Sequence, residues 1–202
     1  EVEYKFDLPK EDDLSEILFT TGTTGKSKGI KIVYRNNVAI AQNVSEAIGI
    51  TNDDVEMVTA PMNHSMALRR TYTVFYKGGT VVLTDGVKFI EDFFKLLDMY
   101  NVTGLTFAPA ILEQLLKFAK DRFGTYSDRL RYIQLGSAPL SEKAKETLKE
   151  MFPNTKLFNI YGATESGCTV SLEFSKYGDK KGSIGKPNVN AEIIFVDDNR
   201  NI

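Results

Sequence analysis

A run of small, hydroxyl-bearing and basic residues lies near the start of the chain, between two apolar segments. The run is Thr20-Thr21-Gly22-Thr23-Thr24-Gly25-Lys26-Ser27-Lys28. Glycines allow consecutive backbone amides to point toward one anion, hydroxyls add donors, and lysine adds positive charge. The run is also longer than the ~2–5 residues of an ordinary hairpin loop. The pattern therefore predicts a phosphate-binding loop, with a flexible Gly/Thr linker as the alternative.

The end of this run also fits part of a Walker A loop, whose pattern is G-x-x-x-x-G-K-[ST]. Gly25-Lys26-Ser27 matches the last three positions, but Thr20 occupies the position of the first glycine. A Walker A loop also opens a helix, whereas the residues after Lys28 alternate in the manner of a strand. Spacing and context therefore both disfavour this alternative.

Two further polar segments follow predicted strands. Residues 136–139, Gly-Ser-Ala-Pro, follow a strand at 131–135, and their small side chains let the backbone approach a ligand closely. Residues 161–167 follow a strand at 156–160 and include an aromatic ring, a hydroxyl and a carboxylate, which suit a base, a phosphate oxygen and a metal ion. Ligands bind beyond the carboxyl ends of parallel strands, so we expect one pocket here, with two ordinary turns as the alternative.

Strands and helices alternate along the chain and must position these segments. Apolar patterning predicts strands at residues 15–19, 29–35, 55–60, 80–83, 103–107, 131–135 and 156–160. Helical periodicity predicts helices at residues 36–48, 65–76, 88–100, 110–123 and 141–152. This alternation predicts an α/β fold with a layered, mostly parallel sheet and flanking helices. After Gly162 the pattern changes to a glycine-rich loop and short strands at 168–172 and 191–196.

The composition is that of an ordinary globular protein. The 202 residues are 42% hydrophobic and 26% charged, which argues against disorder, collagen-like repeats and a coiled coil. The single cysteine, Cys168, excludes an intramolecular disulfide and a multi-cysteine metal site. A net charge of −2 disfavours nucleic acid as a partner, and no apolar stretch approaches the ~18 residues of a transmembrane segment. The oligomeric state stays open.

Five segments together resemble the adenylate-forming, or AMP-binding, superfamily, which includes acyl-CoA synthetases, adenylation domains of peptide synthetases and luciferases. Residues 18–29 resemble its phosphate loop, with Ser27 where the family usually has proline. The other four resembling segments follow in family order: Pro61-Met62-Asn63-His64, Gly136-Ser137-Ala138-Pro139-Leu140, Tyr161-Gly162-Ala163-Thr164-Glu165 and Gly182-Ser183-Ile184-Gly185-Lys186-Pro187. The resemblance covers nearly the whole chain and is most like an acyl-CoA synthetase.

The resemblance implies a reaction and its partners. A small-molecule carboxylic acid attacks the α-phosphorus of ATP, pyrophosphate leaves, and an acyl-adenylate forms. A thiol, often coenzyme A, then takes the acyl group. ATP or AMP, Mg²⁺ and coenzyme A are therefore the expected ligands, and catalysis consists of positioning and charge stabilisation.

The resemblance also implies roles for individual residues. The nucleotide-binding residues it implies are Thr20, Thr21, Gly22, Thr23, Thr24, Gly25, Lys28, Ser137, Ala138, Pro139, Asn159, Tyr161, Gly162 and Thr164. Lys28 and the phosphate loop would hold the β- and γ-phosphates, and Thr164 would bond the α-phosphate. Tyr161 would stack on adenine, with a core tyrosine as the alternative. Glu165 would ligate Mg²⁺, with a solvated turn carboxylate as the alternative.

His64 is the only histidine and completes the implied catalytic set with Lys28, Thr164 and Glu165. The resemblance implies that it lies at the substrate carboxylate and gates the acyl site or the thiol step; a structural histidine is the alternative. Cys168 is interpreted as a small buried or pocket-wall residue and not as a nucleophile. Residues 69 and 70, both arginine, suit an anionic substrate, but a solvated or salt-bridged helix face is favoured.

The ends of the chain favour a fragment. It begins with Glu1, not Met, and its last residues read as a turn followed by the start of another strand. We therefore expect residues 1–202 to be a partial AMP-binding domain from the large N-terminal domain. The ribose-binding aspartate and the C-terminal lid domain with its catalytic lysine should follow Ile202. The piece alone is then expected to be inactive at a normal rate.

Residues 62–66 include no acidic side chain, although amino-acid-activating relatives usually place an aspartate near this segment. Burying an ammonium group without a carboxylate is costly. We therefore expect a fatty or aromatic acid as substrate and coenzyme A as acceptor. We also expect a cytoplasmic enzyme of fatty-acid metabolism. The alternatives are a module that loads an amino acid or acyl group onto a carrier protein, and a non-catalytic nucleotide-binding protein.

Overall fold

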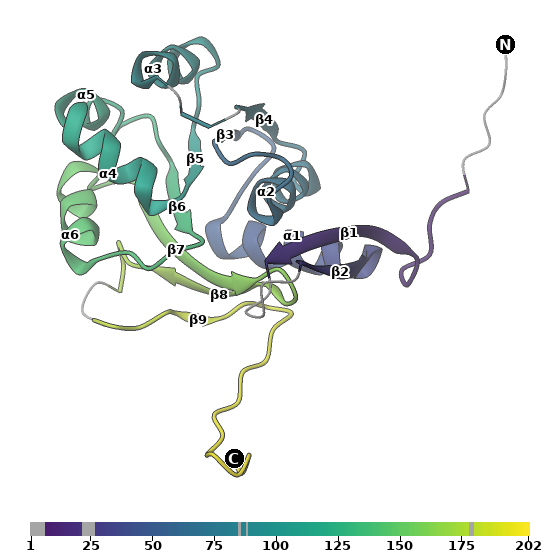
Figure 1. The fold of residues 1–202 in the computed structure, drawn as a ribbon. Helices are drawn as coiled ribbons and strands as arrows, with labels where there is room; N and C mark the ends of the chain where they lie inside the picture. Colours follow the sequence, from purple (N-terminus) through teal and green to yellow (C-terminus); the bar gives the residue numbers. More distant parts are fainter. Residues whose placement is uncertain (1–6, 22–26, 85, 88, 178–179) are drawn as a thin grey trace, which may run out of the picture.

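The computed structural model describes residues 7–21, 27–84, 86–87, 89–177 and 180–202. Their first two strands, β1 (Leu14–Thr21) and β2 (Ser27–Val33), form an antiparallel hairpin in which Thr20 lies opposite Lys28. The hairpin lies beside helix α1 (Tyr34–Ile48), as Figure 1 shows. Strands therefore flank the predicted phosphate loop on both sides, while its positions 22–26 lie outside the described residues.

The main sheet has seven strands in the order β4-β3-β5-β6-β7-β8-β9. Its parallel part consists of β3 (Val55–Val58), β4 (Thr80–Leu83), β5 (Gly104–Phe107), β6 (Tyr132–Gly136) and β7 (Lys156–Ala163). Two antiparallel strands, β8 (Gly167–Glu173) and β9 (Lys186–Pro187), extend one edge. The predicted α/β fold with a mostly parallel sheet is therefore confirmed.

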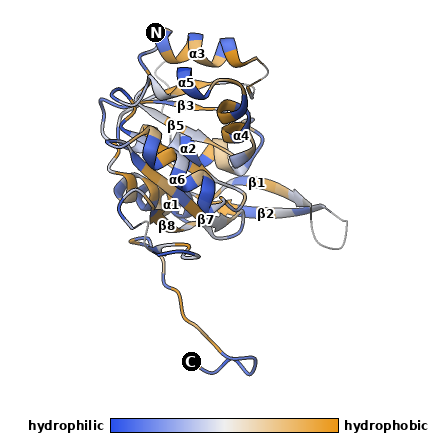
Figure 2. Ribbon diagram, turned by 90° about the vertical axis from the view of Figure 1, so that its left-hand side faces the viewer, coloured by the Kyte–Doolittle hydropathy of each residue, from blue (hydrophilic) through white to orange (hydrophobic). Residues whose placement is uncertain are grey.

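Helices cover both faces of this sheet (Figure 1, Figure 2). One face carries α1 and α2 (Ser65–Tyr76), and the other carries α3 (Ile90–Met99), α4 (Pro109–Phe118), α5 (Lys120–Gly124) and α6 (Glu142–Met151). Strand β6 has apolar side chains on both faces, which explains this covering. Ile133 and Leu135 pack in the core with α3–α6, whereas Tyr132 packs with Val44 and Ile48 of α1. Successive side chains of a strand point to opposite faces, so a strand covered on both sides is buried throughout.

One predicted helix is divided in two in the structure, and one predicted strand is absent from the described residues. The single helix predicted at residues 110–123 is broken at Ala119, whose φ of −149° is not helical. The break lets Phe123 turn into the core, where its ring packs against Phe107 and Phe152. The strand predicted at residues 191–196 does not form, because these largely exposed residues pair with no strand in the described part (Figure 1). Apolar alternation alone does not make a strand, which needs a hydrogen-bonded neighbour.

Candidate functional site

The carboxyl ends of β6 and β7 lie side by side, as predicted, with Gly136 opposite Ile160. The chain leaves β6 through Ser137, whose φ of 67° falls in the left-handed region. Few residues other than glycine adopt this conformation, and such strain is concentrated at ligand sites. The turn leaves residues 137–139 exposed at the edge of the sheet.

Strand β7 was predicted to end at Ile160. It continues to Ala163, because β8 returns antiparallel beside it. The register of the pair shifts between Tyr161 and Gly162. A Cβ atom on Gly162 would lie 1.9 Å from the carbonyl oxygen of Gly167, so only glycine fits this close backbone approach. The predicted signature at 161–165 therefore spans the end of a strand and the tight turn that follows it, at 164–166.

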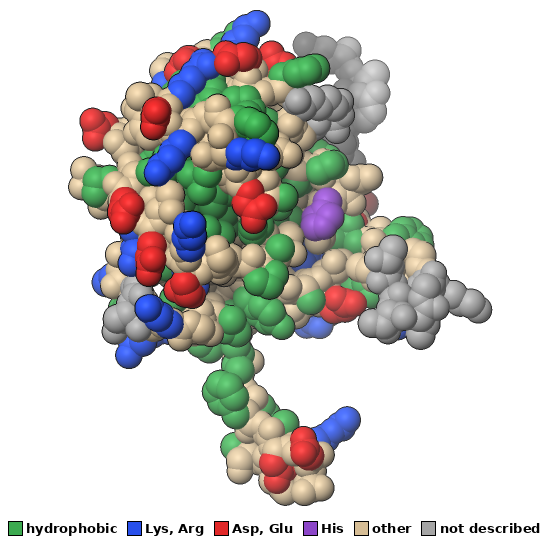
Figure 3. Space-filling view, turned by 60° about the vertical axis from the view of Figure 1, so that its left-hand side comes forward, with side chains coloured by type: hydrophobic (Ala, Val, Ile, Leu, Met, Phe, Trp, Pro, Cys, Tyr) green, Lys and Arg blue, Asp and Glu red, His purple; other side chains and the backbone are tan. Residues whose placement is uncertain are grey.

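Helix α2 brings His64 to the same edge of the sheet. His64 is the N-cap of the helix, and its Nδ1 atom accepts a hydrogen bond from the amide of Met66 at 3.2 Å. Figure 3 shows this side chain, the only histidine, at the molecular surface. The hydroxyl oxygens of Ser65 and Thr164 lie 3.4 Å apart, so the start of α2 contacts the turn after β7.

A cavity of about 220 Å³ lies where these segments meet. Its lining includes His64, Ser137, Gly162 and Thr164, which come from three separate parts of the sequence. Cys168 also lines it, and burial raises the pKa of this thiol even though Arg70 and Arg69 oppose the shift. A protonated thiol fits the interpretation of Cys168 as a pocket wall.

A second cavity, of about 430 Å³, adjoins the first and shares Ser137 and Gly162 with it. Residues 137–139 line it together with Asn159 and Tyr161. The side chain of Tyr161 is not part of the core, because the residue is 58% exposed. The structure thus brings together the predicted residues from β6, β7 and α2 around two adjoining cavities, which together are called the cleft.

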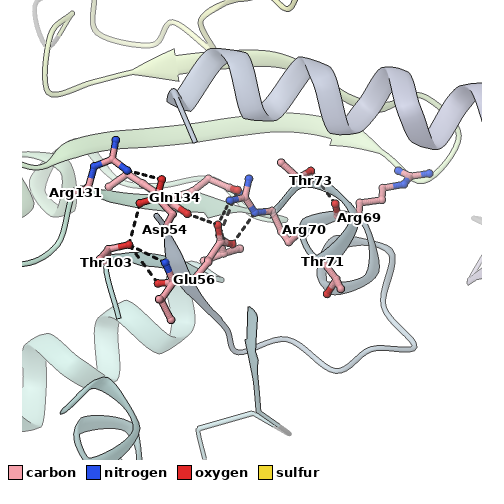
Figure 4. Close-up of polar contacts among 12 residues, drawn as sticks. Asp54, Glu56, Arg69, Arg70, Thr71, Thr73, Thr103, Arg131 and Gln134 are labelled. Carbon is pink, nitrogen blue, oxygen red and sulfur yellow. Dashed lines mark hydrogen bonds and ion pairs between the residues drawn. The ribbon is translucent and has the colours of Figure 1, made fainter. Parts of the chain in front are cut away.

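Arg69 and Arg70 are both buried, so the favoured interpretation as a solvated helix face is wrong. Arg69 donates from Nη1 to the carbonyl oxygen of Ala163 at 3.0 Å, and from Nη2 to that of Thr164. Arg70 points in another direction, toward the sheet, and forms an ion pair with Glu56 (Figure 4). The salt-bridged part of the prediction therefore holds for Arg70.

The sequence interpretation named Arg69 but did not assign it to the site, because it favoured a solvated or salt-bridged helix face. It follows Ser65 by four residues, and residues at this spacing lie on one face of a helix. This spacing is the sequence signal that could have placed Arg69 at the cleft, because Ser65 directly follows the predicted site residue His64.

A buried network fixes α2 on the sheet. Glu56 is fully buried and accepts hydrogen bonds from Arg70, from the Tyr132 hydroxyl at 2.7 Å and from the Thr106 hydroxyl at 2.8 Å. Burial, the largest single effect, lowers the pKa of Arg70, but the charge of Glu56, the hydrogen bond to it and smaller contributions from Tyr132 and Cys168 together raise that pKa. Burial, followed by the charge of Glu56, raises the pKa of Tyr132 well above 10.0. Both groups therefore stay protonated donors.

The β1–β2 hairpin is attached to α2, which lines the cleft, and to α1. The Tyr72 hydroxyl of α2 donates to Glu16 of β1 at 3.1 Å, and burial together with this carboxylate raises the pKa of Tyr72 to about 12. Asn37 of α1 donates to the Ser15 hydroxyl at 3.1 Å. The predicted phosphate-loop residues Thr20, Thr21 and Lys28 lie on the two strands, whereas positions 22–25 lie outside the described residues.

The predicted metal ligand, Glu165, is an exposed carboxylate on the turn that carries Thr164. Within the part of the chain that the structure describes, no three His, Cys, Asp or Glu side chains gather as a metal cluster. No helix among these described residues is both long and apolar enough to span a membrane.

Curated relatives are similar to nearly all of the chain. The 4-coumarate-CoA ligase 1 of Narcissus pseudonarcissus is 30% identical over 195 residues, which are 92% of this chain and 35% of that protein. The peroxisomal OPC-8:0-CoA ligase 1 of Arabidopsis thaliana is 27% identical over 190 residues, 93% of this chain and 35% of that protein. The chain therefore spans about a third of the length of these relatives.

Solved structures of a CoA synthetase are also similar to the chain. A double mutant of o-succinylbenzoate CoA synthetase from Bacillus subtilis, bound with its product analogue OSB-NCoA, matches with a TM-score of 0.82 and 27% identity, over 95% of this chain and 38% of that one. The same synthetase in complex with AMP matches with a TM-score of 0.77 and 27% identity, over 89% and 36%. The family model described as AMP-binding enzyme matches residues 2–202. The chain belongs to this family of AMP-binding enzymes.

Proposed function

We propose that the protein activates a carboxylic acid with ATP. A carboxylate oxygen attacks the α-phosphorus, the bond from that phosphorus to the pyrophosphate oxygen breaks, and an acyl-adenylate forms. The thiol of coenzyme A then attacks the acyl carbon and AMP leaves. The observation that carries the proposal is the cleft in which His64, Thr164 and Tyr161 meet at the carboxyl edge of the parallel sheet. Such edges are where open α/β sheets bind their ligands.

The two cavities suit the two ends of an adenylate. Adenine stacks on the exposed ring of Tyr161 in the second cavity, against residues 137–139. The α-phosphate then lies near Gly162, which both cavities share, and accepts a hydrogen bond from the Thr164 hydroxyl. Lys28 and the loop between β1 and β2 hold the β- and γ-phosphates.

Glu165 fits the role of a magnesium ligand in a nucleotide complex. Mg²⁺ usually takes one or two carboxylates together with substrate phosphates and water, not a cage made wholly of protein. Glu165 is exposed and follows Thr164 directly in the turn, so its carboxylate can reach a metal ion at the proposed α-phosphate. When bound there, the ion supplies positive charge that neutralises the phosphate oxygens.

The first cavity favours an acid without an amino group. The residues known to line it include no carboxylate, and its buried charged side chain is Arg69. An ammonium group would lose water there beside another cation, which is costly. The names of the similar plant proteins, both CoA ligases, further support a fatty or aromatic acid and coenzyme A as substrates.

We also propose that residues 1–202 are a central part of a larger ligase whose C-terminal lid domain closes over the cleft. The chain spans about a third of the relatives' length. His64 and Tyr161 are exposed in this part, as residues covered by a lid would be. These residues alone should bind nucleotide weakly and catalyse pyrophosphate exchange far more slowly than the complete protein.

Exchange of labelled pyrophosphate into ATP by the complete protein tests this function across a panel of fatty, aromatic and amino acids. We expect exchange with fatty or aromatic acids, and a CoA thioester when coenzyme A is added. Exchange with amino acids alone would overturn the substrate class. Exchange followed by transfer only to a carrier protein would overturn the acceptor, and absence of exchange with every acid would overturn adenylation.

A further inference from the structure

Arg69 joins α2 to the turn after β7. Its guanidinium donates to two successive carbonyl oxygens, those of Ala163 and Thr164, and the residue is only 4% exposed. Figure 4 shows its side chain directed away from Arg70 and from the buried network around Glu56. Backbone carbonyls, and no carboxylate among the described residues, are thus the hydrogen-bond partners of this buried cation.

Burying the Arg69 guanidinium lowers the stability of the fold. Taking a guanidinium out of water is unfavourable, and burial lowers the pKa of Arg69. A neutral residue of similar length would fill the same volume without that cost. The buried guanidinium makes two hydrogen bonds to the turn after β7. We therefore assign Arg69 the role of holding that turn in place.

The base of Arg69 is itself held in place. The next residue, Arg70, binds Glu56 on β3, so α2 cannot move along the sheet without breaking a buried ion pair. At the other end of the side chain, the turn carries Thr164 and Glu165, and the Thr164 hydroxyl lies 3.4 Å from that of Ser65. Arg69 therefore connects a fixed helix to the segment with the proposed phosphate and magnesium ligands.

We propose that Arg69 is a positioning residue for adenylation, which fastens the 163–164 backbone to α2 so that Thr164 faces the same cavity as His64. This inference rests on the proposed function. In this role Arg69 acts through the carbonyl groups of the turn. A displacement of about 1 Å in a catalytic group can lower a rate about 100-fold, so loss of Arg69 lowers kcat more than it raises KM.

The test compares Arg69→Met and Arg69→Lys in the complete protein, with Arg131→Met as the matched control. Arg131 pairs with Asp54 just before β6 begins, at the end of the sheet opposite the cleft. Hydrogen–deuterium exchange of the amides at 164–168 reports on the turn without requiring activity. Pyrophosphate exchange gives kcat and KM, and thermal unfolding reports stability.

For Arg69→Met we expect amide exchange at 164–168 to be about tenfold faster, because the turn loses two hydrogen bonds. We expect kcat to fall about 100-fold with little change in KM. Arg69→Lys should restore part of both, because an ammonium reaches one carbonyl, and Arg131→Met should change neither.

Unchanged amide exchange in Arg69→Met would overturn the proposal. So would a raised KM for the acid at constant kcat, because that result would make Arg69 a substrate ligand. A kcat loss equalled by Arg131→Met would indicate a general loss of stability instead. If the unsubstituted protein exchanges no pyrophosphate, the proposed function fails, and the amide exchange still decides whether Arg69 holds the turn.

Discussion

Replacing Arg70 by Met removes one partner of a fully buried ion pair. Glu56 then loses two guanidinium donors, Nη2 and the Nε that lies at 2.8 Å. It keeps the hydroxyl donors of Tyr132 and Thr106, at 2.7 and 2.8 Å. Both members of the pair are almost inaccessible, with side-chain exposures of 2% and 0%. The carboxylate therefore stays buried with half of its stabilising contacts.

An uncompensated buried charge of this kind costs about 3–5 kcal/mol of unfolding free energy. That is a large share of the ~5–15 kcal/mol of a typical domain. Tyr132 and Thr106 donate to different oxygens of Glu56, so adding Glu56→Gln to Arg70→Met removes the charge and retains an oxygen acceptor for one of the two hydroxyls. The double variant should therefore recover roughly 1–3 kcal/mol of the loss. Arg35→Met, which breaks the exposed pair with Asp12, should cost under about 1 kcal/mol.

Urea unfolding at constant pH measures these differences. The chain has nine tyrosines and no tryptophan, so tyrosine fluorescence and circular dichroism follow the transition. A loss below about 1 kcal/mol for Arg70→Met would show that the pair does not hold α2 on the sheet. Equal stability of the single variant and the Glu56→Gln/Arg70→Met double variant would refute the role given to the buried charge.

Two further substitutions test contacts at the two ends of the sheet. Burial opposes ionisation of Asp54, but its hydrogen bonds, that from Arg131 first, lower its pKa below 3.8. The stability lost in Asp54→Asn, measured by urea unfolding, should be full at pH 7 and vanish as the pH falls through the lowered pKa; a loss independent of pH would contradict this. Gly162→Ala, whose new Cβ meets the Gly167 carbonyl, should lower the melting temperature far more than Gly124→Ala, where the nearest atom is 3.8 Å away; equal shifts would refute the steric reasoning.

Local pattern was enough to predict most of the fold. The helix predicted at 65–76 has the bounds of α2, and the strand predicted at 80–83 has those of β4. In both, apolar periodicity and polar flanking residues indicate the same boundary. Helix α1 instead begins at Tyr34, two residues before its predicted start, and Asn36 lies inside the first turn, where its Oδ1 accepts from the Val33 amide at 3.2 Å.

The features that local pattern did not predict depend on contacts between residues far apart in the sequence. Periodicity continues from α4 into α5, but the core needs the ring of Phe123, so the helix breaks at Ala119. The extension of β7 to Ala163 depends on β8, a partner that follows it in sequence. The role of Arg69 depends on carbonyl oxygens 94 and 95 residues away, which no local pattern reports.

The most direct test of the account is carboxylate-dependent pyrophosphate exchange by the complete protein and its Glu165→Gln variant. Glu150→Gln, an exposed carboxylate on α6, is the matched control. Loss of one group that stabilises charge in the transition state should lower exchange by roughly 100-fold in Glu165→Gln, and the control should match the unsubstituted protein. Equal exchange in all three proteins would contradict the assignment of the nucleotide site to the cleft between α2, β6 and β7.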